Sequence, residues 1–377
     1  MATILATAEP FAFGPVGRLI SILKPLSKHH QIHFFGSGSA LNLAQKEDYQ
    51  VIRNIHPTSK RYKDSIKSLA KQADIFISSL DRPSVLTLSS QLPTVYIDGL
   101  FWLWQELPGY LKSVDAYIRV QSHIQNPQST KLAKSIKNLI TVGPIIDYSI
   151  NNSPRLKTLL INFGGLTAKG WYSLKDNPYH LVFTKLLLDH VHLDNFNHVY
   201  IVSNQSAIEQ LNNNFKSNLP RKVKLLNLSH DQFVDKLSNS TLLISSPGGQ
   251  TSMEAFASRT PTFFLPPNND TQYLWLKSFK SHHAAQESIH WEHFYKPLNI
   301  FNSSPKTTIS KLFQYLDNFS QDQDKQAQIT DAINRFIKIS STQKKQVRAQ
   351  DKYFQSLGGN GLSKATAVIE KIIAKSL

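Results

Sequence analysis

Residues Ser245–Gln272, which read SSPGGQTSMEAFASRTPTFFLPPNNDTQ, decide the fold of this chain. A short apolar run before them predicts a strand that ends in a turn at Gly248-Gly249. A helix-like segment that contains Glu254 follows, then a second apolar strand at Thr262–Leu265 and a polar loop. The order strand, glycine turn, helix, strand predicts an α/β unit with parallel strands. A Gly-Gly turn lets backbone N–H groups approach a ligand, and the N-terminus of the next helix favours an anion.

Seven positions of this stretch occur in the order of a known donor-nucleotide motif: Gly248, Gly249, Thr251, Glu254, Pro261, Pro266 and Gln272. The stretch resembles the UDP-sugar group of GT-B glycosyltransferases, which includes macrolide and plant-type transferases and the GlcNAc transferase of lipid II synthesis. The resemblance implies that the glycine turn and the helix N-terminus bind the diphosphate, that Glu254 binds the ribose, and that Gln272 contacts the donor sugar. Gln250 and Asp270 lie beside these positions and are further donor-binding candidates.

Two departures from the family pattern bear on the donor sugar more than on the fold. Arg259-Thr260 stands where the family usually has a glycine before the proline, and residues 268–271 replace a His or Asp directly before Gln272. The alternative interpretation of the whole stretch is an ordinary βαβ turn with a solvated Glu254.

Length, charge and cysteine content narrow the class of protein. The chain has 377 residues, which predicts two domains, and a formal net charge of +16, which favours anionic partners. The basic residues are scattered, so we interpret them as a solvated basic face. We expect no nucleic acid as partner, and peripheral membrane contact is the less favoured alternative. The absence of cysteine excludes disulfides, thiolate metal sites and a cysteine nucleophile.

The N-terminus opens directly into a strand-like run at Thr3–Ala8, without the charged segment of a secretory signal. No apolar stretch approaches the ~18–20 residues that a membrane-spanning helix requires. We therefore expect a soluble cytoplasmic protein.

Apolar runs of strand length alternate with amphipathic helical stretches, which predicts α/β units with parallel sheets. The expected strands are Thr3–Ala8, Gln31–Phe35, Ile75–Ser78, Thr94–Ile97, Ala116–Val120, Leu139–Val142, Thr158–Asn162, His198–Val202, Lys222–Leu226, Leu242–Ser245 and Thr262–Leu265. After Pro305 the chain is expected to be almost wholly helical.

Two consecutive α/β halves predict a GT-B architecture, in which two Rossmann-like domains face a cleft and a helical extension follows. We assign residues 1–147 to an acceptor-binding domain, 148–156 to a linker and 157–360 to a nucleotide-sugar-binding domain. The resemblance implies that a last helix, within 361–377, returns toward the N-terminal domain.

In each half of the chain, a glycine-containing loop follows the opening strand. In the first, Gly14 and Gly17 resemble the acceptor-side loop of the family, with a helix expected to open at Arg18 in the place of the usual catalytic histidine. An arginine there could bind a carboxylate or a phosphate through two parallel hydrogen bonds of its guanidinium. The alternative is an exposed arginine on the helix surface. In the second, the backbone of Gly164 and Gly165, with Thr167 or Lys169, is expected to meet the β-phosphate, or forms only a tight turn.

An inverting transferase needs a general base beside the acceptor nucleophile. Asp98 is our first candidate, followed by Glu9 and Asp81, because all three follow expected strands, and ligands of open α/β sheets bind beyond the carboxyl ends of strands. The alternative for each is a turn-stabilising carboxylate. Trp102 and Trp104 are candidates for a stacking wall on the acceptor side, and the alternatives are core or a membrane-touching patch.

The sequence thus predicts a glycosyltransferase that uses a UDP-sugar and a small-molecule acceptor, with no cofactor and no bound metal. A narrower resemblance joins FGPVGRL, VYIDGLFWLW and the GG-x-T-S-M-E turn to cytosylglucuronate synthases, which implies UDP-glucuronate as donor and cytosine as acceptor. A non-catalytic nucleotide-sugar-binding protein and a sugar-nucleotide 2-epimerase remain alternatives. The sequence leaves the oligomeric state open.

Overall fold

The computed structural model describes residues 1–57, 59–148, 155–168 and 171–377, which divide into two compact units. The first unit contains Met1–Asp147 together with Leu357–Leu377, and the second contains Tyr148–Ser356. Most of the expected linker, residues 149–154, and the phosphate-contact candidate Lys169 lie outside the described residues.

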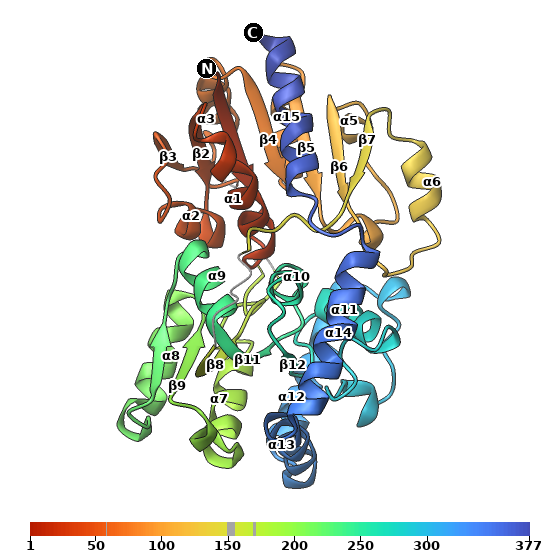
Figure 1. Cartoon of the computed structure of the whole chain (residues 1–377). Coiled ribbons are helices and arrows are strands. Elements are labelled where there is room, and N and C mark those ends of the chain that lie inside the picture. Colours follow the sequence, from red (N-terminus) through yellow and green to blue (C-terminus); the bar gives the residue numbers. More distant parts are fainter. Residues whose placement is uncertain (58, 149–154, 169–170) are drawn as a thin grey trace. The chain divides into compact units, whose positions relative to one another are not determined.

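The described part of the first unit is built on a seven-stranded parallel sheet with the strand order β3-β2-β1-β4-β5-β6-β7 (Figure 1). Its strands are β1 (Thr3–Ala8), β2 (Gln31–Gly36), β3 (Val51–Asn54), β4 (Ile75–Ser79), β5 (Thr94–Asp98), β6 (Ala116–Val120) and β7 (Leu139–Val142). Its helices are α1 (Gly14–Leu26), α2 (Gly38–Ala44), α3 (Tyr62–Ala70), α4 (Arg82–Leu88), α5 (Gly109–Lys112), α6 (Ser129–Lys134) and α15 (Leu362–Ser376), with a 3-10 turn at Phe101–Leu103.

Side-chain alternation along the strands divides the core of this unit between the two faces of the sheet. Ile4 and Ile77 pack in one cluster with residues of α1 and α15, whereas Leu5 and Phe76 pack in another with residues of α3, α4 and α5. Both faces are therefore covered, which explains why the strands read as continuous apolar runs.

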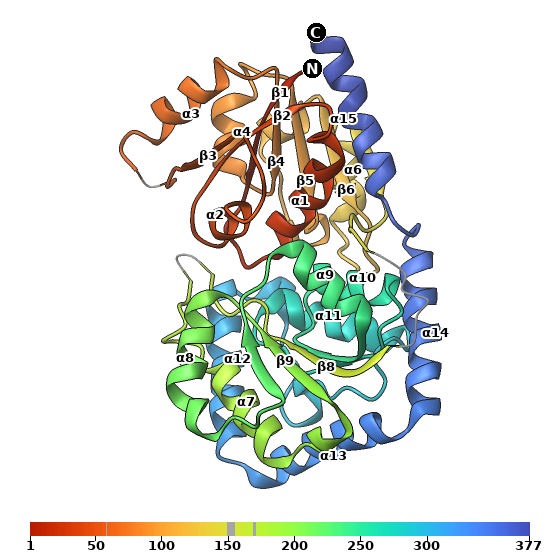
Figure 2. The ribbon, with the colours of Figure 1, turned by 60° about the vertical axis from the view of Figure 1, so that its left-hand side comes forward.

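The last helix belongs to the first unit, where α15 packs against α1 and β7 (Figures 1 and 2). Just before α15, the backbone of residues 358–361 crosses the backbone of Gly143, which follows β7. A Cβ added there would lie 2.0 Å from the carbonyl oxygen of Gly359, and one added at Gly361 would lie 2.4 Å from the oxygen of Gly143. Only glycine permits this approach, so the crossing holds the start of α15 against the end of β7.

The described part of the second unit has a five-stranded parallel sheet with the order β10-β9-β8-β11-β12. Its strands are β8 (Leu156–Asn162), β9 (His198–Val202), β10 (Val223–Leu226), β11 (Ser240–Ser245) and β12 (Thr262–Phe264). Its helices are α7 (Tyr179–His190), α8 (Gln205–Phe215), α9 (His230–Asn239), α10 (Gly249–Ala257), α11 (Asp270–Ser281), α12 (Pro305–Ser320), α13 (Gln323–Lys338) and α14 (Ser340–Ser356).

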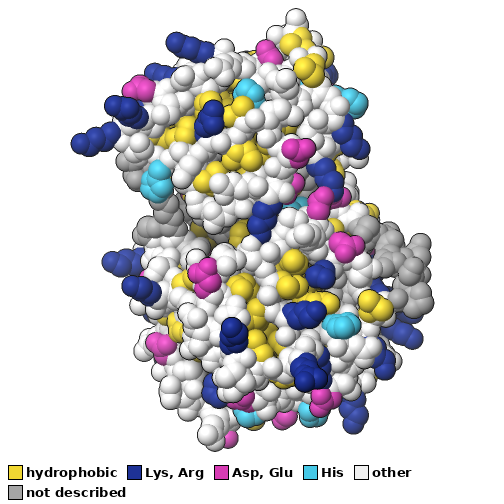
Figure 3. Space-filling view, turned by 90° about the vertical axis from the view of Figure 1, so that its left-hand side faces the viewer, with side chains coloured by type: hydrophobic (Ala, Val, Ile, Leu, Met, Phe, Trp, Pro, Cys, Tyr) yellow, Lys and Arg dark blue, Asp and Glu magenta, His cyan; other side chains and the backbone are white. Residues whose placement is uncertain are grey.

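Lys and Arg side chains are spread over both units on the face shown in Figure 3, and acidic and neutral side chains lie among them. Among the described residues, no helix combines the length and the apolar character needed to cross a membrane.

Candidate functional site

The expected βαβ unit is present as β11, α10 and β12. β8 lies beside β11 in the same sheet, and the loops at the carboxyl ends of these three strands meet. The carbonyl oxygen of Gly164, after β8, accepts hydrogen bonds from Gln272 Nε2 (2.9 Å) and Asn268 Nδ2 (3.2 Å). The amide N–H of Gly164 donates to Ser246 Oγ, after β11, at 3.0 Å. One glycine thus joins the loops after all three strands.

Gly165 must be glycine because its φ is +71° and because a Cβ there would lie 2.6 Å from both Asn269 Nδ2 and Gln272 Nε2. Gln272 is almost buried, and its Oε1 accepts from the backbone N–H of Asn268 at 3.1 Å. Both ends of its amide therefore hold the loops together. The expected contact of Gln272 with a donor sugar stays a prediction, and it would compete with these bonds.

The two glycines of the turn before α10 have different surroundings. A Cβ at Gly248 would meet nothing within 4 Å, so this position borders open space. A Cβ at Gly249 would lie 2.8 Å from the indole of Trp275, so this glycine is set by packing. The N-cap residue of α10, Gly248, has no side chain that could cap the helix. The first amides of an α-helix have no acceptor within the helix itself.

The carboxylate of Glu254 is 1% exposed, one turn inside α10, and two side chains hold it. His230 Nε2 lies 3.0 Å from its Oε1, and Gln250 Nε2 donates to the same oxygen at 2.9 Å. The sequence does not predict the pairing of His230 with Glu254, because 24 residues separate the two and no local spacing links them. Its only signal was its place at a helix start after a strand of the same sheet.

Asp270 is the first residue of α11, rather than part of the preceding loop, because Asn269 caps that helix by accepting from the N–H of Gln272 at 3.0 Å. Burial raises the pKa of the Asp270 carboxyl above its usual range, while the backbone N–H of Thr271 opposes this shift. Asp270 therefore lies at the same edge of the sheet as Gln272 and Gly165.

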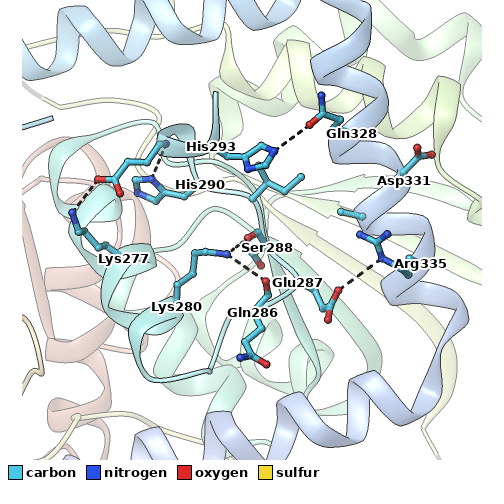
Figure 4. A pocket seen from close by; sticks show the side chains of 13 residues that line it. Lys277, Lys280, Gln286, Glu287, Ser288, His290, His293, Gln328, Asp331 and Arg335 are labelled. Carbon is cyan, nitrogen blue, oxygen red and sulfur yellow. Dashed lines mark hydrogen bonds and ion pairs between the residues drawn. The ribbon is translucent and has the colours of Figure 1, made fainter. Parts of the chain in front are cut away.

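A cavity of about 670 Å³ lies beside α11 and α13, at the segment Gln286–His293 (Figure 4). Its charged groups are largely paired with one another: Lys277 Nζ lies 3.0 Å from Glu292 Oε1, and Arg335 Nε lies 3.9 Å from Glu287 Oε2. Trp291, which lies within this segment but does not line the cavity, supports the loop after β12, because its Nε1 donates to the Pro267 carbonyl at 2.6 Å. We interpret the segment Gln286–His293 as a support for the loop after β12.

In the first unit, Asp98 ends β5 and is fully buried. Its Oδ2 accepts from Trp104 Nε1 (2.7 Å) and Tyr117 OH (2.5 Å), and its Oδ1 accepts from the N–H of Leu100 (2.7 Å). Burial raises the pKa of this carboxyl, and the bond from Tyr117 opposes the shift. Since a base must reach the proton that it abstracts, this geometry suits an anchor for the aromatic loop better than a general base.

The other two carboxylate candidates differ in exposure. Asp81 is almost buried and caps α4, where Ser84 donates to it through its N–H (3.2 Å) and its Oγ (2.6 Å), so the turn-stabilising alternative describes its contacts. Glu9 follows β1 and keeps part of its surface exposed. Nearby, Ala12 and Leu80 have φ of 52° and 65°, uncommon for residues with a side chain, in the loops after β1 and β4.

The glycines of the first loop lie inside α1 and not before it, because the helix begins at Gly14 with a proline in its first turn. Arg18 is therefore an interior residue of this helix and is 8% exposed, which corrects the alternative of an exposed helix arginine. A Cβ added at Gly99 would lie 2.4 Å from the guanidinium, so Arg18 lies flat against the turn after β5.

Of the two expected stacking residues, Trp102 is 3% exposed and belongs to the core. Trp104 keeps part of its surface exposed, and the guanidinium of Arg82 lies 3.6 Å from the centre of its ring. A stacking role on the acceptor side therefore remains a prediction for Trp104. Among the described residues, no group of three or more His, Asp or Glu side chains is arranged to hold a metal ion.

No protein-family model matches the chain, and no curated protein matches its sequence. Its fold does match solved structures. The glycotransferase of kitacinnamycin is 12% identical, with 99% of both chains covered and a TM-score of 0.54. The spinosyn rhamnosyltransferase SpnG, complexed with spinosyn aglycone, is 11% identical over 99% of this chain and 100% of its own, with a TM-score of 0.53.

The glycosyltransferase VinC, in complex with dTDP, is 10% identical over 99% of this chain and 100% of its own, with a TM-score of 0.50. The parallel sheets of seven and five strands and the helical C-terminal part agree with this group. The chain therefore has the GT-B fold of glycosyltransferases.

Proposed function

We propose that the chain is a glycosyltransferase that moves a sugar from a UDP-sugar to a small-molecule acceptor without a bound metal. The observation that carries this proposal is the meeting of three strand-end loops beside an uncapped helix N-terminus and the buried carboxylate of Glu254. Such an N-terminus favours phosphate, and a carboxylate one turn away suits sugar hydroxyls.

In this proposal the N–H groups of the first turn of α10 and the open side of Gly248 receive the diphosphate. The Gly164–Gly165 loop completes that cradle, Glu254 accepts from the ribose hydroxyls, and Asp270 accepts from the donor sugar. Preorganised amides stabilise the negative charge that develops on the leaving diphosphate, which is the task a metal ion performs in other enzymes.

We assign the general base to Glu9, because it is the one candidate carboxylate that keeps exposed surface while Asp98 and Asp81 are buried and bonded. The acceptor nucleophile gives its proton to Glu9 and forms a bond to the anomeric carbon. The bond from that carbon to the diphosphate oxygen breaks, and UDP leaves with the electron pair. This direct displacement inverts the anomeric centre.

The sequence resemblance to cytosylglucuronate synthases makes UDP-glucuronate and cytosine the first donor and acceptor to test. On the acceptor side Trp104 offers a ring for a flat base, and Arg18 offers a cation close to the same edge of the sheet. The support that these two residues give to the narrower proposal is their type: an aromatic ring can stack on a base, and a cation can bind a carboxylate.

A binding screen tests the donor assignment. Thermal unfolding is measured with UDP, UDP-glucose, UDP-GlcNAc, UDP-glucuronate, TDP-glucose and GDP-mannose, with a chelator present. A ligand at 100 times its Kd stabilises the folded state by about 2.7 kcal/mol, which a thermal shift detects. Selective response to UDP species supports the proposal, and no response to any of them overturns the donor assignment.

A turnover assay with the bound donor then tests the base. Glu9→Gln is expected to keep UDP affinity and to lose roughly 10²–10⁴-fold in kcat, as removal of a general base does. Glu106→Gln, a change of the same chemistry at an exposed position of the same unit, is the control. Binding without turnover by the wild type would instead indicate a nucleotide-sugar-binding protein, and isomerisation without UDP release would indicate an epimerase.

A further inference from the structure

The position of His230 in the second unit is fixed from both sides. It is the first residue of α9, directly after a reciprocal cap in which Ser229 Oγ accepts from the N–H of Gln232 (3.2 Å) and Gln232 Oε1 accepts from the N–H of Ser229 (3.0 Å). The imidazole is 6% exposed. Such a double cap sets the direction in which the helix begins, and with it the origin of this side chain.

The imidazole contacts one oxygen of one carboxylate. His230 Nε2 lies 3.0 Å from Glu254 Oε1, and Gln250 Nε2 reaches the same oxygen at 2.9 Å. A carboxylate only accepts, so this contact places a proton on Nε2 of His230. Neither bond uses Oε2, so the two donors fix the plane of the carboxylate and leave its second oxygen for other donors.

We propose that His230 is a positioning residue that sets the orientation of Glu254 and thereby makes the site prefer a ribonucleotide to a 2′-deoxyribonucleotide. The inference rests on the proposed function, in which Glu254 accepts from the ribose. A ribose 2′-hydroxyl donates to Oε2, whereas a deoxyribose leaves this nearly buried oxygen without that donor. Sites built to bond a hydroxyl reject the analogue that lacks it more strongly than apolar pockets reject a missing methylene.

The experiment compares UDP with 2′-deoxy-UDP on the full chain by calorimetry. For the wild type we expect UDP to bind about 10- to 100-fold more tightly, the range of a hydrogen bond to a charged group. His230→Ala is expected to weaken UDP and leave 2′-deoxy-UDP unchanged, so that the ratio of the two affinities falls toward one. His230→Gln, which keeps an N–H donor, is expected to retain most of the ratio.

Controls separate positioning from a structural role. A merely structural histidine would change both affinities equally, and His180→Ala, at a buried histidine bonded to Gln210 at 2.8 Å in the same unit, should leave the ratio intact. In a Glu254→Ala background, the further change His230→Ala should not alter the ratio at all. His230→Phe keeps an aromatic ring and removes the donor, so it provides the same test if the alanine variant does not fold.

The outcomes distinguish the two proposals. A wild-type protein that binds neither nucleotide overturns the proposed function. A wild type that binds both equally, or a His230→Ala or His230→Phe protein that keeps the full ratio, overturns the positioning role while leaving a UDP-sugar site in place. Loss of the ratio on removal of His230, with its retention in His230→Gln, supports the inference.

Discussion

The adjacent glycines before α10 allow one substitution to separate stability from binding. Gly249→Ala would place a Cβ 2.8 Å from Cε2 and Nε1 of Trp275, whereas Gly248→Ala would place one where nothing lies within 4 Å. Neither glycine has a positive φ, so backbone strain does not distinguish them. We expect Gly249→Ala to destabilise the second unit and Gly248→Ala to leave its stability unchanged while it weakens UDP binding.

The expected magnitude follows from what the new methyl group meets. Trp275 is nearly buried and its ring stacks on Phe279 with centroids 5.5 Å apart, so it cannot withdraw freely, and such overpacking costs about 1–3 kcal/mol. For a domain of this size that lowers Tm by roughly 2–10 °C. At Gly248 a poorer N-cap costs a few tenths of a kcal/mol, and the stiffer unfolded chain offsets about as much.

Thermal unfolding of both variants, with and without UDP, provides the measurement. Gly249→Ala should melt at a lower temperature without ligand, and adding Trp275→Phe should restore part of the loss because the smaller ring withdraws the nearest atoms. Gly248→Ala should melt with the wild type but lose most of the shift induced by UDP, because its methyl group enters the space assigned to the diphosphate. A Gly249→Ala protein as stable as the wild type would refute the packing argument, and an unchanged UDP shift in Gly248→Ala would refute the diphosphate position.

Three further predictions concern the rest of the fold. Gly143→Ala places a Cβ 2.0 Å from a facing backbone oxygen, so it should lower the free energy of unfolding by about 3 kcal/mol and speed hydrogen exchange in α15. Gly109→Ala, whose Cβ would meet nothing within 4 Å, is the control and should change neither quantity. Burial lowers the pKa of His290 to about 4, whereas the same group in the unfolded chain keeps its usual pKa of 6.5. Between pH 6.5 and pH 4 the unfolded chain therefore binds a proton that the folded chain does not. The free energy of unfolding should fall by up to about 3 kcal/mol as the pH drops through this range. That slope should flatten in His290→Gln when unfolding in urea is followed across this range. Asp98→Ala leaves the buried hydroxyl of Tyr117 and the indole N–H of Trp104 without their acceptor, so it should lower the free energy of unfolding by about 3 kcal/mol and change the fluorescence of Trp104. Retention of full stability would contradict the anchor role.

The order of the elements could be predicted because both sheets are parallel and covered on both faces, so that their strands are continuous apolar runs. β1, β6, β7 and β9 have the bounds that the sequence predicts. The strand that the sequence analysis missed is β3, Val51–Asn54, at the edge of the first sheet. Its last two residues are exposed, so no apolar run marks it.

The helix starts were harder to predict than the strands because two helices begin at glycines without a capping side chain. α1 begins at Gly14 and not at Arg18, and α10 begins at Gly249, where no side chain provides a cap. A glycine pair predicts a loop, but at Gly249 the glycine is required by the indole of Trp275, 26 residues later in the chain. A contact at that distance in sequence leaves no local pattern.

The candidate carboxylates show why residue type and position at a strand end do not suffice to assign a base. Glu9, Asp81 and Asp98 all lie at or just after the carboxyl ends of strands of one sheet, so their positions in the sequence predict equal access to a ligand at this edge. The structure separates them through partners that lie elsewhere in the chain: Tyr117 lies 19 residues from Asp98, and Thr7 lies 74 residues from Asp81. The hydrogen bonds of Asp81 and Asp98 stabilise the loops that contain them, and Glu9 differs from both in keeping part of its surface exposed. By that criterion Glu9, in the loop after β1, is the base that we propose, and the hydrogen bonds of Asp98 to Leu100 and Trp104 hold the aromatic loop after β5.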